Sequence, residues 1–176
     1  EGVTPDLEVM ARAVARTHLD TGLPIMAHSF PTGHVARQQI KIFKEEGVDL
    51  TRVKIDHCND TTDTEYLKWI LDQGCYLGLD RYPGRNVSPH MRTVTMKRLI
   101  DMGYEDRLCP SHDCICLAVI KENPDGTMPD THDFARHNPD QFLYIHRKVI
   151  PDLKDMGVSD ATIEKLFVTN PRRYFF

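Results

Sequence analysis

Apolar residues follow a helical spacing at the start of the chain and then form a short continuous run. Residues 5–21 predict a helix because side chains with apolar surface recur there every three or four positions. These are Leu7, Met10, Val14 and His18. Thr4 is a suitable N-cap and Pro5 fits the first helical position. Residues 23–28 follow as an apolar run with the length of a buried parallel strand.

The same pair of helix and strand recurs three more times. Further strands are predicted at residues 53–57, 75–80 and 107–112, and further helices at residues 35–46, 63–73 and 89–102. The side chains expected on the buried helix faces are Ile40, Phe43, Tyr66, Leu67, Ile70 and Leu71. Glycines end the four helices at Gly22, Gly47, Gly74 and Gly103, which are 25, 27 and 29 residues apart. This regular alternation is typical of a parallel α/β fold.

Residues 114–138 interrupt the alternation. This segment is rich in Pro, Asp, Gly and His and is too long for an ordinary connection, so we interpret it as a functional lid or loop. Closing helices are predicted at residues 141–156 and 159–166, and Asn170 and Pro171 begin a last helical turn. Two architectures fit four such units. One is a small doubly wound sheet, and the other is half of a (β/α)8 barrel, whose usual length is about 250 residues.

The composition describes one globular domain and excludes several classes of protein. The 176 residues are 40% apolar and 27% charged, and no run of about 18 apolar residues predicts a transmembrane helix. The formal net charge is −4 and no stripe of Lys and Arg stands out. We therefore expect neither a membrane nor a nucleic acid as a partner.

Cysteine usage and the first residues bear on the compartment. The chain has five cysteines, which are Cys58, Cys75, Cys109, Cys114 and Cys116. Their odd number and the apolar surroundings of three of them favour reduced thiols in a cytoplasmic protein over a disulfide framework. The first residues contain neither an initiator Met nor a signal-peptide pattern. We therefore expect a cytoplasmic chain that is cut at its start.

Titratable residues stand at the ends of all four predicted strands. They are His28, His57, Asp80 and Asp113. Because the carboxyl ends of barrel strands lie on one face, these side chains can converge. Imidazole and carboxylate groups bind zinc, iron, cobalt or manganese, and a carboxylate can also act as a base. A hydrogen-bonded structural His, or an Asp that caps a helix, would explain each residue singly, so both interpretations stay open.

Several segments resemble the phosphotriesterase family of the amidohydrolase superfamily, in the order that this family has them. Residues 22–29 (GLPIMAHS) resemble its fifth strand, residues 45–50 (EEGVDL), 52–53 (RV) and 56–60 (DHCND) its sixth, residues 76–82 (YLGLDRY) its seventh, and residues 111–113 (SHD) its eighth. Residues 150–153 (IPDL), 157–158 (GV) and 170–175 (NPRRYF) look like its closing helices. The resemblance covers nearly the whole chain. It implies that residues 1–176 form the C-terminal half of one TIM barrel, strands 5 to 8 with their helices, and that the N-terminal half is absent.

The resemblance also implies a binuclear metal site. His28 and His57 would bind the more exposed of two divalent metal ions, with zinc expected first and iron, cobalt or manganese as alternatives. Asp113 would bind the more buried ion and accept a proton from the bridging hydroxide. Asp60 would carry this proton toward solvent while it is hydrogen-bonded to Arg81.

Arg81 and the residues beside it bear on the substrate. Phosphotriesterases proper typically have His at the position of Arg81, and residues 78–82 are instead similar to the lactonase branch of the family. A plain salt bridge from Arg81 to Asp60 or Asp80 is the alternative. Tyr82 and Cys114 would face the substrate, although both could equally be packing residues.

The chain departs from the family pattern in three places. The family has a His-x-His pair on its first strand and a bridging, carboxylated Lys on its fourth. This chain contains no His-x-His, and it begins just after the place where that Lys should be. Asp56 stands where family members commonly have Gly.

The implied function is metal-dependent hydrolysis of a small-molecule substrate in an intact protein that forms a homodimer. The substrate would be a lactone, with organophosphate triesters as a side activity. One alternative is a catalytically inactive barrel that binds small molecules, and another is a half barrel that pairs with a second chain. A doubly wound nucleotide-binding protein is disfavoured because no Gly-rich loop follows any predicted strand.

Overall fold

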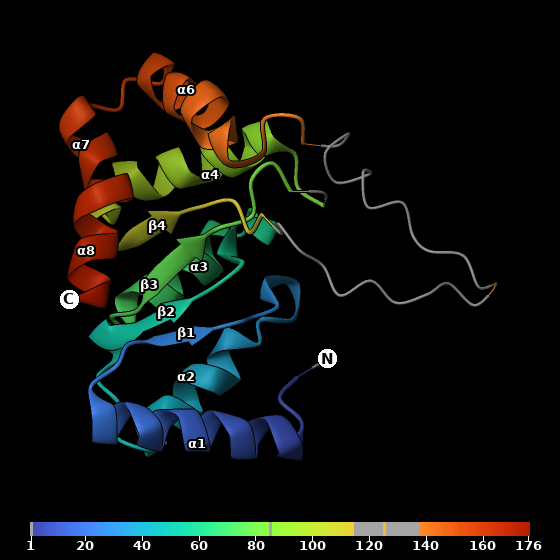
Figure 1. Ribbon diagram of the computed structural model, residues 1–176, viewed down its shortest axis with the longest axis vertical. Helices are drawn as coiled ribbons and strands as arrows, with labels where there is room; N and C mark the ends of the chain where they lie inside the picture. Colours follow the sequence, from blue (N-terminus) through green and yellow to red (C-terminus); the bar gives the residue numbers. More distant parts are fainter. Residues whose placement is uncertain (1, 85, 115–124, 126–137) are drawn as a thin grey trace.

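Four parallel strands form one sheet in the order in which they occur along the chain (Figure 1). The computed structural model describes residues 2–84, 86–114, 125 and 138–176. The strands are β1 (Ile25–Ala27), β2 (Val53–Ile55), β3 (Tyr76–Leu79) and β4 (Leu108–Pro110). Each strand pairs only with its neighbours along the chain in the described residues, with Ile25 opposite Val53 and Gly78 opposite Cys109. The predicted parallel α/β architecture is therefore confirmed.

One helix precedes β1 and helices follow each strand, as the apolar pattern predicts. They are α1 (Pro5–Thr21), α2 (Ala36–Glu45), α3 (Thr64–Asp72), α4 (Pro89–Asp101), α6 (Ile150–Asp155), α7 (Asp160–Glu164) and α8 (Asn170–Phe175). Helix α1 has its predicted bounds, with the hydroxyl of Thr4 accepting a hydrogen bond from the Leu7 amide at 3.3 Å and Gly22 in the left-handed region as its C-cap. The closing helices differ from the prediction, because π-helical turns at Ile145–Val149 and Lys165–Thr169 precede α6 and α8.

One face of the sheet packs against helices to form the core. Alternate strand residues such as Ile25, Val53 and Leu77 are buried in it, as are the side chains predicted for α2 and α3. The opposite face carries Met26, Lys54, Tyr76, Gly78 and Cys109, because successive strand residues point to opposite sides. This face is covered in part. The Tyr174 ring of α8 packs on Tyr76 and Cys109, whereas Met26 is exposed.

Helix α8 closes the amino ends of the strands (Figure 1). The hydroxyl of Tyr174 donates a hydrogen bond to the Ile25 carbonyl at 2.7 Å, and the side-chain amide of Asn170 donates one to the Leu108 carbonyl at 2.9 Å. These two bonds tie α8 to the first residues of both outer strands. The carboxyl ends of the strands, where the sequence places its titratable residues, lie away from α8.

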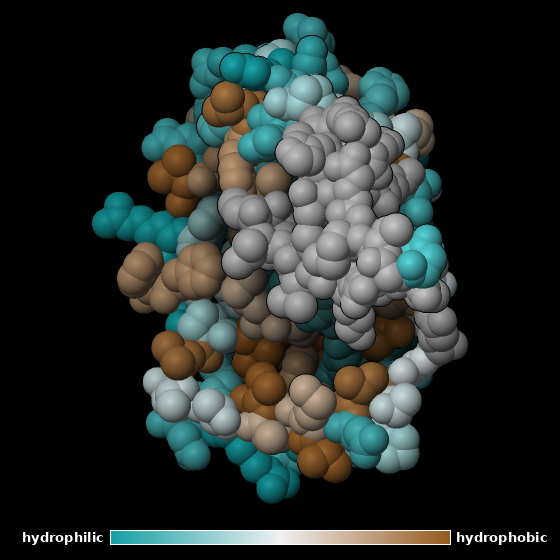
Figure 2. All heavy atoms as spheres, turned by 45° about the vertical axis from the view of Figure 1, so that its right-hand side comes forward, coloured by the Kyte–Doolittle hydropathy of each residue, from teal (hydrophilic) through white to brown (hydrophobic). Residues whose placement is uncertain are grey.

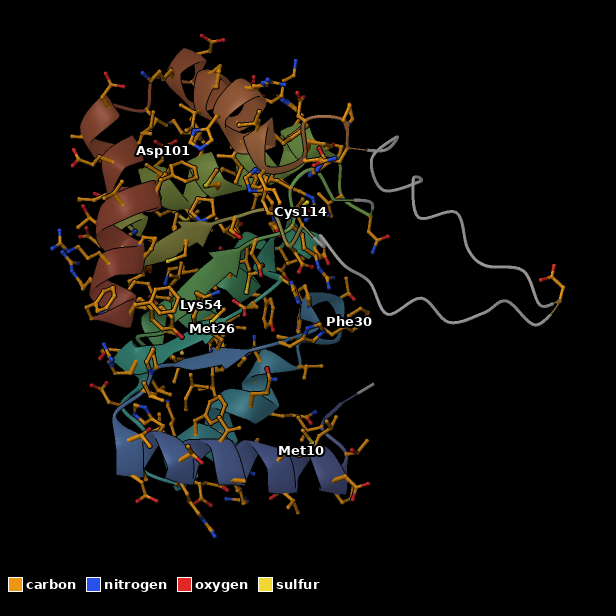
Figure 3. All side chains as sticks on the ribbon, in the orientation of Figure 1. Met10, Met26, Phe30, Lys54, Asp101 and Cys114 are labelled. Atoms are coloured by element: carbon orange, nitrogen blue, oxygen red, sulfur yellow. The ribbon has the colours of Figure 1, made fainter. Side chains whose placement is uncertain are left out.

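Several apolar side chains on the β1 side of the molecule lie exposed. Leu7, Met10 and Val14 give α1 its helical periodicity, yet the buried residues of this helix are Ala15 and His18, and Met10 is 62% exposed. Figure 2 shows apolar side chains on the lower part of its face, and Figure 3 labels Met10, Met26 and Phe30 along α1 and β1. We call the surface formed by Leu7, Met10, Val14, Met26 and Phe30 the β1-side apolar surface. No described helix is long and apolar enough to cross a bilayer.

Candidate functional site

The ends of β1 and β2 bring His28 and His57 into contact. The backbone N–H of Asp56 donates to the Ala27 carbonyl at 2.9 Å, so the pairing of the two strands continues up to the residue before each histidine. His57 Nε2 lies 2.8 Å from His28 Nδ1, and the two rings meet edge to face with centroids 4.3 Å apart. The prediction that residues 29 positions apart in sequence converge at the strand ends is therefore confirmed for this pair.

Asp80, at the end of β3, orients His57. Its Oδ1 accepts a hydrogen bond from the backbone N–H of His57 at 2.7 Å, and its Oδ2 lies 3.3 Å from His57 Nδ1. The second contact is not a well-aligned hydrogen bond, because the buried Nδ1 has no such partner among the described residues. The backbone of His57 has a φ of 63°, a conformation that residues other than Gly rarely adopt. Its position therefore depends on the contacts around it.

The two histidines have opposite electrostatic environments. Contact with the Asp80 carboxylate raises the pKa of His57. Burial would raise the pKa of Asp80, but His57 more than offsets burial and lowers it. Burial lowers the pKa of His28, and the nearby charges of His57 and Arg81 lower it further. The lowered pKa favours the neutral imidazole of His28, which is the form that binds a metal ion.

Arg81 connects two carboxylates at the ends of different strands. Its Nη1 donates to Asp60 Oδ2 at 2.6 Å and its Nε donates to Asp113 Oδ2 at 3.1 Å. Burial lowers the pKa of Arg81, but these two bonds raise it more. Of the alternatives for Arg81, the structure shows ion pairs with Asp60 and Asp113, whereas the alternative pair with Asp80 does not form among the described contacts.

Asp113 lies beside the histidine pair but does not complete a metal site with it. Its Oδ2 is 4.0 Å from His57 Nδ1, and its side chain is 41% exposed. Within the described part of the chain, no three His, Cys, Asp or Glu side chains are grouped so that they could hold a metal ion together. The donor chemistry fits a divalent metal ion, because two imidazole nitrogens face one another and the buried His57 Nδ1 is poorly satisfied. Further ligands would have to join this pair.

Tyr82 and Cys114 differ in their accessibility. The Tyr82 side chain is buried in the core, where its hydroxyl lies 3.5 Å from Thr93 Oγ1 and burial raises its pKa. In this structure Tyr82 therefore packs, which is one of the two roles that the sequence allows, and its contact with a substrate stays a prediction. Cys114 is partly exposed directly after Asp113 (Figure 3). The rest of the predicted loop at residues 114–138 lies almost wholly outside the described residues.

Asp56 has a local role that the sequence does not reveal. Its carboxylate forms a buried ion pair with Lys54, on the sheet face opposite the helices. Burial raises the pKa of Asp56, although Lys54 acts against this effect. Gly78 on β3 makes room for the pair, since a Cβ at this position would overlap Asp56 Oδ1 and lie 3.0 Å from Asp56 Cα. The departure at position 56 is thus matched by a lysine on β2, the strand just before it, and by a glycine on the neighbouring strand, β3.

Sequence reasoning misses Arg92 of α4, which is also part of this network. Its side chain is fully buried, and its Nη2 donates to Asp60 Oδ1 at 2.7 Å. One signal could have found it. Arg92 shares the helical spacing of Met96 and Leu99, so a cation stands on the apolar face of the helix.

Comparisons with known proteins show the family of this chain. A model of the phosphotriesterase family matches residues 1–175. The chain is 40% identical to a phosphotriesterase homology protein of Mycobacterium tuberculosis, over 99% of this chain and 52% of that protein. It is 34% identical to an aryldialkylphosphatase of Saccharolobus solfataricus, over 99% of this chain and 54% of that protein.

A solved structure, that of the phosphotriesterase from Mycobacterium tuberculosis, matches with a TM-score of 0.88 at 39% identity, over 99% of this chain and 52% of that chain. The fold is therefore that of part of a phosphotriesterase TIM barrel. The chain spans about half the length of these relatives. From the match over almost all of its residues, the chain belongs to the phosphotriesterase family.

Proposed function

We propose that this chain supplies the second half of a binuclear-metal-dependent hydrolase that acts on ester bonds. The observation that carries the proposal is the His28–His57 contact at 2.8 Å, formed at the ends of adjacent parallel strands and oriented by Asp80. The aryldialkylphosphatase among the relatives supports hydrolysis as the reaction class. Residues 1–176 would then be the C-terminal half of a single barrel domain.

His28 and His57 would hold one of two divalent metal ions, and Asp113 would contribute to the other. When bound, such ions lower the pKa of water and polarise the oxygen under attack. Asp113 would accept the proton at its carboxylate, and Asp60 would carry it toward solvent. Arg81 keeps both carboxylates in place through its hydrogen bonds to each. Zinc is the first expectation for the ions, and iron, cobalt and manganese suit the same donors.

The substrate would be a lactone, with organophosphate triesters hydrolysed more slowly. Arg81 supports the lactone through the similarity of residues 78–82 to the lactonase branch. Its side chain is one-third exposed at the strand ends and carries a permanent positive charge. Cys114, partly exposed beside Asp113, would contact the substrate, and the segment that follows it would shape the leaving-group pocket. Tyr82 would support this pocket from the core.

The β1-side apolar surface is where we expect the first half of the barrel to dock. Leu7, Met10 and Met26 are exposed there. In the described residues, the only strand that pairs with β1 is β2, so the other edge of β1 is open. An open strand edge beside exposed apolar side chains favours association with another strand and helix. The relatives are about twice as long as the matched part, and a segment of that further length would provide such a strand and helix. The intact protein would be a homodimer in the cytoplasm, and the buried, unbridged Cys58 and Cys75 are in keeping with that compartment.

The test is metal content and hydrolysis in a completed barrel. This chain would be joined to the remaining half of the Mycobacterium tuberculosis relative, and elemental analysis would be combined with lactone and organophosphate assays. We expect about two metal ions per barrel, with both metal and turnover lost in His57→Ala. His90→Ala, at an exposed position of α4, is the matched control. A metal-free barrel, or one that binds lactones without hydrolysing them, would contradict the proposal and support a binding protein.

A further inference from the structure

Arg92 is a fully buried cation with three hydrogen-bond acceptors. Its Nη1 donates to the Asn59 carbonyl at 2.6 Å, its Nη2 to Asp60 Oδ1 at 2.7 Å, and its Nε to the Val87 carbonyl at 3.0 Å. The side chain has no exposed surface. A buried guanidinium is tolerated only when it is hydrogen-bonded and its charge is paired. Each of the three nitrogens of Arg92 has an acceptor, and Asp60 pairs its charge beside the strand-end site.

The loop between β3 and α4 is shaped around this guanidinium. Gly84 has a φ of 71°, and a Cβ at this position would overlap the Arg92 guanidinium. The loop therefore approaches Arg92 as closely as a residue without a side chain permits. Val87, at the far end of the same loop, supplies one of the three acceptors.

Arg92 also begins a line of alternating charges that leads from the core to the strand ends. Asp60 lies between Arg92 and Arg81, with one carboxylate oxygen bound to each guanidinium. Arg81 in turn binds Asp113. Side-chain exposure rises along this line, from 0% at Arg92 through 11% at Asp60 and 33% at Arg81 to 41% at Asp113. Only the buried end can fix the line in place, because exposed pairs are mobile and screened by solvent.

We propose that Arg92 is a positioning residue: it fixes Asp60, and through Asp60 and Arg81 it sets the place of the Asp113 carboxylate. The catalytic consequence rests on the proposed function, whereas the positioning itself does not. Asn59 strengthens the arrangement, because its carbonyl accepts from Arg92 while its side-chain Oδ1 accepts from the Arg81 backbone N–H at 3.1 Å. Lys cannot replace Arg92, since a single ammonium group does not reproduce a planar fork that serves three acceptors.

The first test measures hydrogen exchange at Arg81 Nε–H in the 176-residue chain by nuclear magnetic resonance. This N–H group donates a hydrogen bond to Asp113, so its exchange rate reports on the far end of the line of charges. In Arg92→Lys we expect its exchange to become about fivefold faster or more, the effect of losing one hydrogen bond, while amides of β2 keep their protection. The control is Arg98→Lys, an exposed position on the same helix, which should change neither.

Gly84→Ala is the second variant and keeps Arg92 in the chain. The added methyl group should displace the guanidinium and accelerate exchange at Arg81 Nε–H in the same way. In the double variant with Arg92→Lys, no further acceleration is expected, because the two changes act through the same contact. Additive acceleration would overturn the proposal. So would unchanged exchange at Arg81 in either single variant.

Turnover in the completed barrel separates this proposal from the proposed function. We expect Arg92→Lys to lower kcat roughly tenfold or more with little change in KM, and Arg98→Lys to leave both unchanged. If the unsubstituted barrel is inactive while exchange at Arg81 responds as described, the hydrolase assignment fails and the positioning role stands. If the barrel is active but Arg81 and kcat do not respond to Arg92→Lys, the positioning role fails alone.

Discussion

Two ion-pair networks of similar composition lie in different environments of this molecule. One, the α1–α2 network, joins two helices on the outer surface through Glu8, Arg12, Arg16, Glu45 and Glu46. The other, the strand-end network, consists of Arg92, Asp60, Arg81 and Asp113. Nitrogen–oxygen distances overlap, at 2.6–2.9 Å in the first and 2.6–3.1 Å in the second. Distance therefore does not distinguish the two networks.

Burial distinguishes them at one residue. Side-chain exposure ranges from 13% at Glu46 to 69% at Arg16 in the α1–α2 network. The strand-end network overlaps that range at Arg81 and Asp113, but its Arg92 has no exposed surface. Exposed ion pairs contribute little because water and salt screen them and their side chains lose freedom on pairing. A buried pair is different, because removing one partner leaves the other charged and without solvent. We conclude that only the strand-end network can hold its members in one geometry, which is what a site requires.

Arg92→Ala should give the largest effect of the substitutions that we consider. It removes the only buried cation of the strand-end network among the described residues and leaves the Asn59 and Val87 carbonyls without their donor. The expected loss in the free energy of unfolding is about 3–5 kcal/mol, measured by urea denaturation. Arg98→Ala should change it by less than about 0.5 kcal/mol. A loss below about 1 kcal/mol for Arg92→Ala would place both networks in one class.

Gly84→Ala should have the next largest effect. The new Cβ overlaps the Arg92 guanidinium, so we expect a loss of about 1–3 kcal/mol from overpacking, in addition to the backbone strain at positive φ. Gly22→Ala is the matched control, because Gly22 has nearly the same φ, 72°, and no atom within 4 Å of an added Cβ. The difference between the two variants measures the contact with Arg92. Equal losses would mean that backbone strain alone explains the glycine.

Asp113→Asn tests the exposed end of the strand-end network. The carboxylate is 41% exposed, so its bond to Arg81 should contribute less than about 1 kcal/mol to stability. In the completed barrel, by contrast, this change should abolish turnover, since Asn cannot accept the proton. Thermal unfolding and a lactone assay on the same variant separate the two effects. A large loss of stability with turnover retained would reverse the roles that we give to the two ends.

Much of the fold follows from local patterns that the sequence states directly. Helix α1 has its predicted bounds because Thr4, Pro5 and Gly22 specify its ends through local hydrogen bonds and backbone angles. The strand order follows from the regular repeat of helix and strand, although the strands are two to three residues shorter than predicted. Short strands result where the chain turns away at the carboxyl end, as at His57 with its left-handed φ.

Tertiary contacts decide what local patterns cannot. The periodicity of Leu7, Met10 and Val14 predicts a helix but not what its apolar side meets, and in this chain that side is exposed. The convergence of His28 and His57 was predictable, because strand ends in a parallel sheet share one edge. The role of Arg92 was not, since it reaches the site from a helix and not from a strand end. Nor was the bond from the His57 backbone N–H to Asp80, which depends on the left-handed turn of the chain at His57.

Glu46→Gln should have the smallest effect and provides the contrast to Arg92. Hydrogen bonds from Arg16 and Arg12 lower the pKa of Glu46 below its ordinary value of 4.5. A carboxylate with a lowered pKa stabilises the fold at pH values above its ordinary pKa, and this stabilisation is lost as the pH falls through the folded-state pKa. At pH 7 we therefore expect a small decrease in Tm, which disappears in acid and in 1 M salt. Glu164→Gln, at an exposed position of α7, is the control. If the decrease persisted in 1 M salt, the α1–α2 network would be shielded from solvent, and burial could no longer be what separates it from the strand-end network.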